Sequence, residues 1–235
     1  MVFGVFEGRV EDKLELADKE GPQSKVTGLR EAVSSLIRPG MHIHIGHSYM
    51  RPNATIYEIC RQWWGKDPDF TISSLGFIAN MVLFIYGGLT RRLITTFCGD
   101  SYPFPGPNRI YQDAFREGRL EIENWTVLTL PQRLLAGALG VEWMPTHSII
   151  GSSMQEENAH AFCVMETPDG GRVGMVRALR PDLTLIHGWA ADEAGNVLLT
   201  PPYAENAHAA FAAREGVLVT VEKIVSRSEL RRYSH

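Results

Sequence analysis

The chain has 235 residues, of which 44% are hydrophobic and 21% charged, and this composition is typical of one globular domain with a large core. Its formal net charge is -4 and its sequence pI is about 6.1, so no basic field is present to drive nonspecific binding to nucleic acid. No apolar run approaches the roughly 18 residues that a membrane helix needs, and the N-terminal sequence MVFGVFEGRV has neither the basic start nor the unbroken apolar run of a signal peptide.

Residues 1–25 are rich in charged side chains and contain the breaker pair Gly21-Pro22, so we interpret them as an arm outside the core. One α/β domain is then expected over residues 26–235. From Thr27 onward, apolar residues recur at three- and four-residue spacing, which predicts a helix with Thr27 as its N-cap and Pro39-Gly40 as its end.

The rest of the chain alternates between short apolar runs and amphipathic segments. Further strands are predicted over residues 41–45, 70–75, 92–97, 172–178 and 216–221. Further helices are predicted over residues 53–64, 78–86, 109–117, 131–139 and 205–214. Residues 78–86 are apolar throughout and fit either kind of element, and we favour a helix. Strands that alternate with helices of about ten residues indicate an α/β fold with a parallel sheet.

The sequence DLTLIHGWAADEAGNV, residues 182–197, predicts one more strand and a turn. Leu183, Leu185 and Ile186 form a near-continuous apolar run, as in a strand that is buried on both faces. A polar turn over residues 191–196 follows. Ligands of parallel sheets bind outside the carboxyl ends of the strands, so this turn lies at an edge where a site is expected.

The loop at residues 46–52 is the first candidate site, because a strand there runs through Gly46, His47 and Ser48 towards the start of a helix. Backbone N–H groups in such a turn can hold a phosphate, a carboxylate or a developing oxyanion. An ordinary strand–helix turn is the alternative interpretation.

Three histidines near this loop raise the question of a metal site. His42 and His44 are two residues apart, which places them on one face of a strand, and His47 follows. No acidic residue or further ligand is evident nearby, and a central parallel strand can also hold hydrogen-bonded core histidines. We therefore expect no metal here.

The second candidate loop is Gly151-Ser152-Ser153-Met154, which follows the apolar pair Ile149-Ile150. Glycine and small hydroxyl residues let a ligand approach the backbone and offer hydrogen bonds. Glu157 follows and is a candidate acid or base. A solvated loop is the alternative interpretation.

The sequence contains no evident nucleophile of its own. Cys60, Cys98 and Cys163 are far apart and form no CxxC pattern, which indicates a reducing cytoplasm. The chain also has no GxSxG elbow, no Walker loop and no GxGxxG turn.

An ordered set of segments between residues 27 and 232 carries a family resemblance. In chain order they are LREAVSSLIRPGM, HIHIG, Arg51-Pro52, FREGRLEIENW, LPQRLLAGALGVEWMPT, Gly151-Ser152-Ser153, ALRPDLTLIHGWAADEAGNV and GVLVTVEKIVSRSELRR. The set resembles the alpha-type subunit of family I coenzyme A transferases, of the glutaconate CoA-transferase type. It is also similar to the related alpha subunit of a bacterial ring-opening CoA-thioester hydrolase of steroid breakdown.

The resemblance implies a Rossmann-like, mostly parallel sheet with helices on both faces, and a beta-type partner of the same fold in a heterodimer or larger assembly. In that family a glutamate of the beta-type partner attacks the acyl-CoA, so an acyl-glutamyl anhydride and then a glutamyl-CoA thioester form. The CoA thioester is thus a substrate, and no tightly bound cofactor, nucleic acid or membrane is implied. His47 and Glu157 are the catalytic candidates. The binding candidates are Gly46, His47, Ser48, Tyr49, Arg51, Gly151, Ser152, Ser153 and Met154.

Two departures from the family pattern keep other functions open. Where the transferases commonly have a glycine-glycine-aromatic turn, this chain has Gly46-His47-Ser48-Tyr49, whose side chains can add hydrogen bonds. Where the ring-opening hydrolase has a glutamate, this chain has Val127, which cannot act as a base. A CoA-thioester hydrolase or a lyase with His47 or Glu157 as base is the main alternative to a transferase, and a noncatalytic scaffold subunit is a further one.

Overall fold

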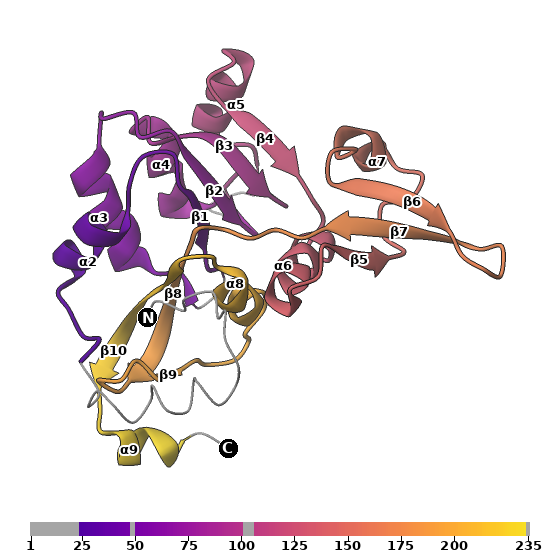
Figure 1. The fold of residues 1–235 in the computed structure, drawn as a ribbon. Helices are drawn as coiled ribbons and strands as arrows, with labels where there is room; N and C mark the ends of the chain where they lie inside the picture. Colours follow the sequence, from indigo (N-terminus) through magenta and orange to yellow (C-terminus); the bar gives the residue numbers. More distant parts are fainter. Residues whose placement is uncertain (1–23, 48–49, 101–105, 234–235) are drawn as a thin grey trace.

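A seven-stranded sheet forms the centre of the molecule (Figure 1). The computed structural model describes residues 24–47, 50–100 and 106–233. The strand order is β10-β8-β1-β2-β3-β4, and neighbours along this row are parallel, whereas β9 pairs antiparallel with β8. The strands are β1 (His42–Ile45), β2 (Phe70–Ser74), β3 (Thr90–Thr95), β4 (Glu121–Asn124), β8 (Leu183–Ala191), β9 (Val197–Leu198) and β10 (Gly216–Ile224).

Helices cover both faces of this sheet, as the resemblance implies. Successive residues of a strand point to opposite faces. On β3, Leu93 packs in one buried cluster and Ile94 in another. The Leu93 cluster holds residues of α2 (Leu29–Leu36), α3 (Asn53–Trp63), the 3-10 turn η2 (Ala79–Met81), α4 (Val82–Tyr86) and α5 (Arg109–Arg116). The Ile94 cluster holds residues of α6 (Thr129–Leu139) and α8 (Asn206–Ala212).

A second, smaller sheet projects from the main body and is not predicted from the sequence (Figure 1). It is antiparallel, with the order β5-β7-β6, and carries the short helix α7 (Ser153–Glu157). Its strands are β5 (Trp143–Thr146), β6 (Phe162–Glu166) and β7 (Arg172–Arg177). Only β7 is expected, because β5 and β6 bury few side chains and give no clear hydrophobic period. Pro145 is tolerated because β5 is an edge strand.

One predicted detail is wrong, one strand is longer than its apolar run, and the expected arm lies largely outside the described residues. Gly28 is the N-cap of α2 and offers no side-chain cap, whereas the Thr27 hydroxyl donates to Glu31 Oε2 (2.9 Å). The strand predicted from the apolar run 183–186 extends to Ala191, because β10 pairs with it over almost its whole length. The expected arm, residues 1–25, falls almost entirely outside the described residues. The short helix α9 (Arg227–Arg231) follows β10.

Candidate functional site

The strands β1 to β4 end side by side and form one edge, which we call the carboxyl edge. Gly46 and His47 follow β1, and Gly76 follows β2. The segments that follow β2 and β3 stay paired through a parallel bridge between Phe77 and Cys98. This is the edge at which parallel sheets bind ligands, and the first candidate loop lies on it.

The backbone of the Gly46 loop is tied to its neighbours. The Gly46 N–H donates to the Leu185 carbonyl (2.8 Å), and the His47 N–H donates to Glu205 Oε1 (3.1 Å). These two N–H groups are therefore not free to bind an oxyanion, contrary to the expectation from the sequence. A Cβ at Gly46 would lie 2.3 Å from Asn206 Oδ1, which explains the glycine. Ser48 and Tyr49 lie outside the described residues.

The His47 side chain is partly buried at the carboxyl edge. Its ring packs against Gly76, where a Cβ would come within 2.8 Å of His47 Cε1. Burial and the charge of Arg51 lower the pKa of His47, and Glu205 opposes them by raising it. The ring is therefore neutral at neutral pH and can accept or donate a proton.

His42 and His44 are hydrogen-bonded core residues. Both rings contact the Ser73 hydroxyl, at 2.9 Å from His42 Nε2 and 3.0 Å from His44 Nδ1. Burial, with the nearby charges of His44 and Arg133, lowers the pKa of His42 to about 3, so this ring is neutral. Among the described residues we find no group of three or more histidine, cysteine, aspartate or glutamate side chains placed to hold a metal.

His44 belongs to a buried lateral row that crosses five strands on the α8 face of the sheet. In strand order, the residues in register are Thr184, His44, Ser73, Ile94 and Glu123. All five are buried, although four of them are polar. Buried polar groups are costly unless they are hydrogen-bonded, so this row constrains its neighbours more than an apolar row would. The polar residues at alternate positions of HIHI are its signal in the sequence.

Glu123 lies at one end of this row and binds four side chains. Its carboxylate contacts Arg133 Nη1 (2.5 Å), Arg92 Nη2 (2.6 Å), Trp125 Nε1 (2.6 Å) and His160 Nε2 (3.3 Å). Burial alone would raise the pKa of Glu123, but the charge of Arg133 and the hydrogen bonds lower it to about 2. Glu123 is thus an ionised structural residue and not a base.

The Gly151 loop is a self-contained turn on the projecting sheet. The Gly151 N–H donates to Gln155 Oε1 (3.0 Å), and the Ser152 hydroxyl donates to the Ile149 carbonyl (2.7 Å). The expected loop continues as α7, and Glu157 at its end is exposed. Figure 1 places α7 apart from β1. The structure therefore does not bring the two candidate loops together within this chain.

Two polar residues of the sequence DLTLIHGWAADEAGNV, residues 182–197, have structural roles. His187 contacts Thr220 Oγ1 (2.9 Å) and Glu222 Oε1 (2.8 Å) on β10. The buried Asp192 carboxylate accepts from the backbone N–H (2.9 Å) and the side-chain amide (2.7 Å) of Asn196, which closes the turn. His187 and Asp192 thus hold the strand and the turn in shape.

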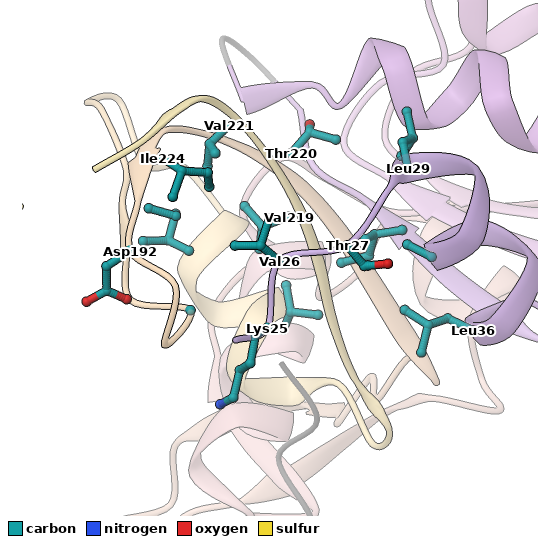
Figure 2. A pocket seen from close by; sticks show the side chains of 16 residues that line it. Lys25, Val26, Thr27, Leu29, Leu36, Asp192, Val219, Thr220, Val221 and Ile224 are labelled. Carbon is teal, nitrogen blue, oxygen red and sulfur yellow. The ribbon is translucent and has the colours of Figure 1, made fainter. Parts of the chain in front are cut away.

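A groove of about 330 Å³ lies beside this turn, between residues 25–29 and β10 (Figure 2). Val219, Val221 and Ile224 line it from β10, and Asp192 stands at its rim. The segment that enters the domain is fixed here, because the Lys25 N–H donates to the Glu193 carbonyl (2.7 Å). None of the candidate site residues lines this groove, so it is separate from the carboxyl edge.

Comparison with known proteins decides the family. The family model for coenzyme A transferase matches residues 26–234. The chain belongs to the coenzyme A transferase family. Its relatives include one subunit of the 3-oxoadipate CoA-transferase of Pseudomonas knackmussii, 31% identical over 84% of this chain and 69% of that protein. The corresponding subunit of the glutaconate CoA-transferase of Acidaminococcus fermentans is 26% identical over 89% of this chain and 69% of that protein.

Solved structures of two similar proteins have the same fold. Glutaconate coenzyme A-transferase from Acidaminococcus fermentans superimposes with a TM-score of 0.77 and 24% identity, over 89% of this CoA-transferase chain and 70% of that one. The decarboxylase AibA/AibB gives a TM-score of 0.74 and 28% identity, over 86% of this chain and 75% of that one. Within the described residues, no helix has the length and apolarity needed to cross a membrane.

Proposed function

We propose that this chain is the alpha subunit of a heteromeric CoA-transferase, which moves CoA between an acyl-CoA and a carboxylic acid. The observation that carries the proposal is that two carboxylates beside the carboxyl edge are ion-paired or buried. Glu123 is held by two arginines, and Glu205 is 0% exposed. Neither can attack an acyl-CoA, which supports a nucleophilic glutamate on a partner subunit.

The carboxyl edge also has the surface that such a partner needs. Phe97, after β3, is 47% exposed, and Val127 and Leu128, after β4, are 73% and 53% exposed. Exposed apolar side chains that gather in one place mark interaction surfaces. We infer that the beta-type subunit docks on these residues and that His47 then faces the acyl group. Arg51 completes this side of the proposed site, and Ser48 and Tyr49 stay binding residues predicted from the sequence.

The proposed reaction divides one exchange into steps on the partner's glutamate. Its carboxylate attacks the acyl-CoA carbonyl and the CoA thiolate leaves, which gives an acyl-glutamyl anhydride. The thiolate then attacks the glutamyl carbonyl and the first acid leaves, which gives a glutamyl-CoA thioester. An incoming acid reverses these steps and departs as its own CoA thioester. The neutral His47 ring hydrogen-bonds the acyl group, and Gly151 to Met154 bind a more distant part of CoA.

A decarboxylase or other lyase, or a CoA-thioester hydrolase, is the second candidate function. The observation that favours it is the 28% identity to the decarboxylase AibA/AibB, together with a neutral imidazole at the carboxyl edge that can act as a base. Val127 argues against the ring-opening hydrolase mechanism, because the sequence resemblance aligns this exposed, apolar residue with that enzyme's glutamate.

Product analysis distinguishes these functions. The chain and its co-purified partner are incubated with succinyl-CoA and either 3-oxoadipate or glutaconate, since relatives of this chain carry these names. We expect the CoA thioester of the acceptor acid to form and free CoA not to accumulate. Free CoA without acceptor consumption indicates a hydrolase, and carbon dioxide indicates a decarboxylase. Full activity that survives substitution of both candidate loops would leave the chain as a scaffold.

A further inference from the structure

Residues 203–206 hold both backbone groups of His47. Glu205 Oε1 accepts the His47 N–H (3.1 Å), and Asn206 Nδ2 donates to the His47 carbonyl (3.4 Å) and to the Tyr203 carbonyl (2.9 Å). Glu205 and Asn206 are both 0% exposed. The segment before α8, which is distant in sequence, therefore fixes where the Gly46 loop carries its imidazole.

Glu205 also contacts the buried polar row. His44 Nε2 lies 3.7 Å from Glu205 Oε1, and both side chains are 0% exposed. Glu205 Oε2 and His44 Nε2 have no hydrogen-bond partner among the described residues. A buried carboxylate with an unsatisfied oxygen is costly, so its retention beside a candidate site calls for a functional reason.

The Ser73 hydroxyl limits where the protons lie. It has one proton and two imidazole contacts, His42 Nε2 and His44 Nδ1, so it donates to one ring and accepts from the other. If it donates to His44 Nδ1, the His44 proton is on Nε2 and faces Glu205. If it accepts from His44 Nδ1, His44 Nε2 carries no proton and presents its lone pair to Glu205. The His44 tautomer thus decides whether this ring can donate to Glu205.

The groups that face the His47 ring come from four segments. The loop after β1 provides Arg51, β1 provides His44, and the segment before α8 provides Glu205. The loop after β2 provides Gly76, which carries no charge. Arg51 and His44 lower the pKa of His47, and Glu205 is the one group of these that raises it.

We propose that Glu205 is a positioning residue that holds the His47 backbone in place and keeps a negative charge beside its imidazole. The role of His47 at the acyl group rests on the proposed function, whereas its contact with Glu205 does not. The Glu205→Gln variant tests this contact, because it keeps an acceptor for the His47 N–H and removes the charge.

The experiment is a histidine NMR titration of the full chain, with the His47 signal assigned by its loss in the His47→Gln variant. We expect the pKa of His47 to be lower in the Glu205→Gln variant than in the native chain. Glu193→Gln, the same change at an exposed residue, is the matched control and leaves the titration unchanged. In the active complex, the acid limb of kcat/KM moves to lower pH in Glu205→Gln.

Two outcomes would overturn the proposal. One is an unchanged His47 titration in a folded Glu205→Gln variant. The other needs no variant: fast hydrogen exchange of the His47 amide in the native chain, which would mean that Glu205 does not hold it. Failure of CoA transfer in every assay would contradict the proposed function but would not affect the NMR titration. The two proposals can therefore fail independently.

Discussion

At the scale of single residues, the His47 side chain is partly exposed at the carboxyl edge, and its surroundings lower its pKa. Its ring is partly buried against Gly76, and its backbone is fixed by Glu205 and Asn206. A side chain held on both sides loses little freedom when a substrate binds. The exposed Glu157 has no comparable support, so of the two catalytic candidates His47 is the stronger hypothesis.

Replacement of His47 by alanine is predicted to lower kcat/KM of the assembled enzyme by about 100-fold, the usual effect of removing a proton donor or acceptor from a site. In the native enzyme, activity falls at acid pH as the ring becomes protonated. Because the pKa of His47 is lowered from 6.5, the midpoint of this fall lies below pH 6.5. A pH profile of kcat/KM measures it. His187→Ala, a histidine whose ring contacts Thr220 and Glu222 on β10, is the control, and equal losses in both variants would contradict the prediction.

At the scale of elements, Glu123 joins the main sheet to its surroundings. It lies on β4 and binds Arg133 of α6, Arg92 of β3 and His160 beyond α7. The Asn158 side-chain amide adds a hydrogen bond to the Asn124 carbonyl (2.9 Å). These contacts orient the projecting sheet and its Gly151 loop relative to β4.

The Glu123→Gln variant is predicted to lower the free energy of unfolding by about 3–5 kcal/mol, because Arg133 is left buried without its counter-charge. The pKa of Glu123 is lowered from 4.5 to about 2 in the folded chain. The carboxylate therefore contributes about 3 kcal/mol above pH 4.5, and this contribution is lost as the pH falls towards 2. Urea unfolding at pH 7 and pH 4 measures both effects. Glu121→Gln, at an exposed residue near the start of β4, is the control, and matching unfolding curves would refute the prediction.

The close packing of α6 against α8 leads to a second prediction at this scale. A Cβ at Gly137 would lie 2.6 Å from the Leu179 carbonyl oxygen and 3.1 Å from the Ala212 Cβ. Gly137→Ala is therefore predicted to destabilise the chain by about 1–3 kcal/mol, although alanine favours a helix. Gly106→Ala, which meets open space, is the control for thermal unfolding. A Tm for Gly137→Ala at or above that of the native chain would contradict the prediction.

Sequence patterns identify the parallel sheet and most of its helices, because buried parallel strands and amphipathic helices have clear hydrophobic periods. They do not identify β5 and β6, which bury few side chains. They locate the Gly46 loop but not Glu205, which is 158 residues away from His47 in the chain. A contact between such distant residues exists only once β8 and α8 are packed, so no local pattern encodes it.

At the scale of the whole molecule, the chain offers half of a site. His47 and the exposed Phe97 lie on the carboxyl edge, and the Gly151 loop lies on a separate, projecting sheet. A partner that covers the carboxyl edge would bury these apolar side chains and supply a nucleophile. Phe97→Glu is predicted to prevent co-purification of the beta-type subunit, measured by native mass spectrometry. Exposed Phe211→Glu on α8 is the control, and a complex that survives Phe97→Glu would place the interface elsewhere.

The location of the covalent intermediate tests the shared site most directly. The purified complex is incubated with succinyl-CoA, denatured, and each subunit is weighed by intact mass spectrometry. We predict that the partner subunit gains the mass of a glutamyl-CoA thioester and that this chain keeps its native mass. A CoA adduct on this chain would contradict the proposal that the nucleophilic glutamate belongs to the partner.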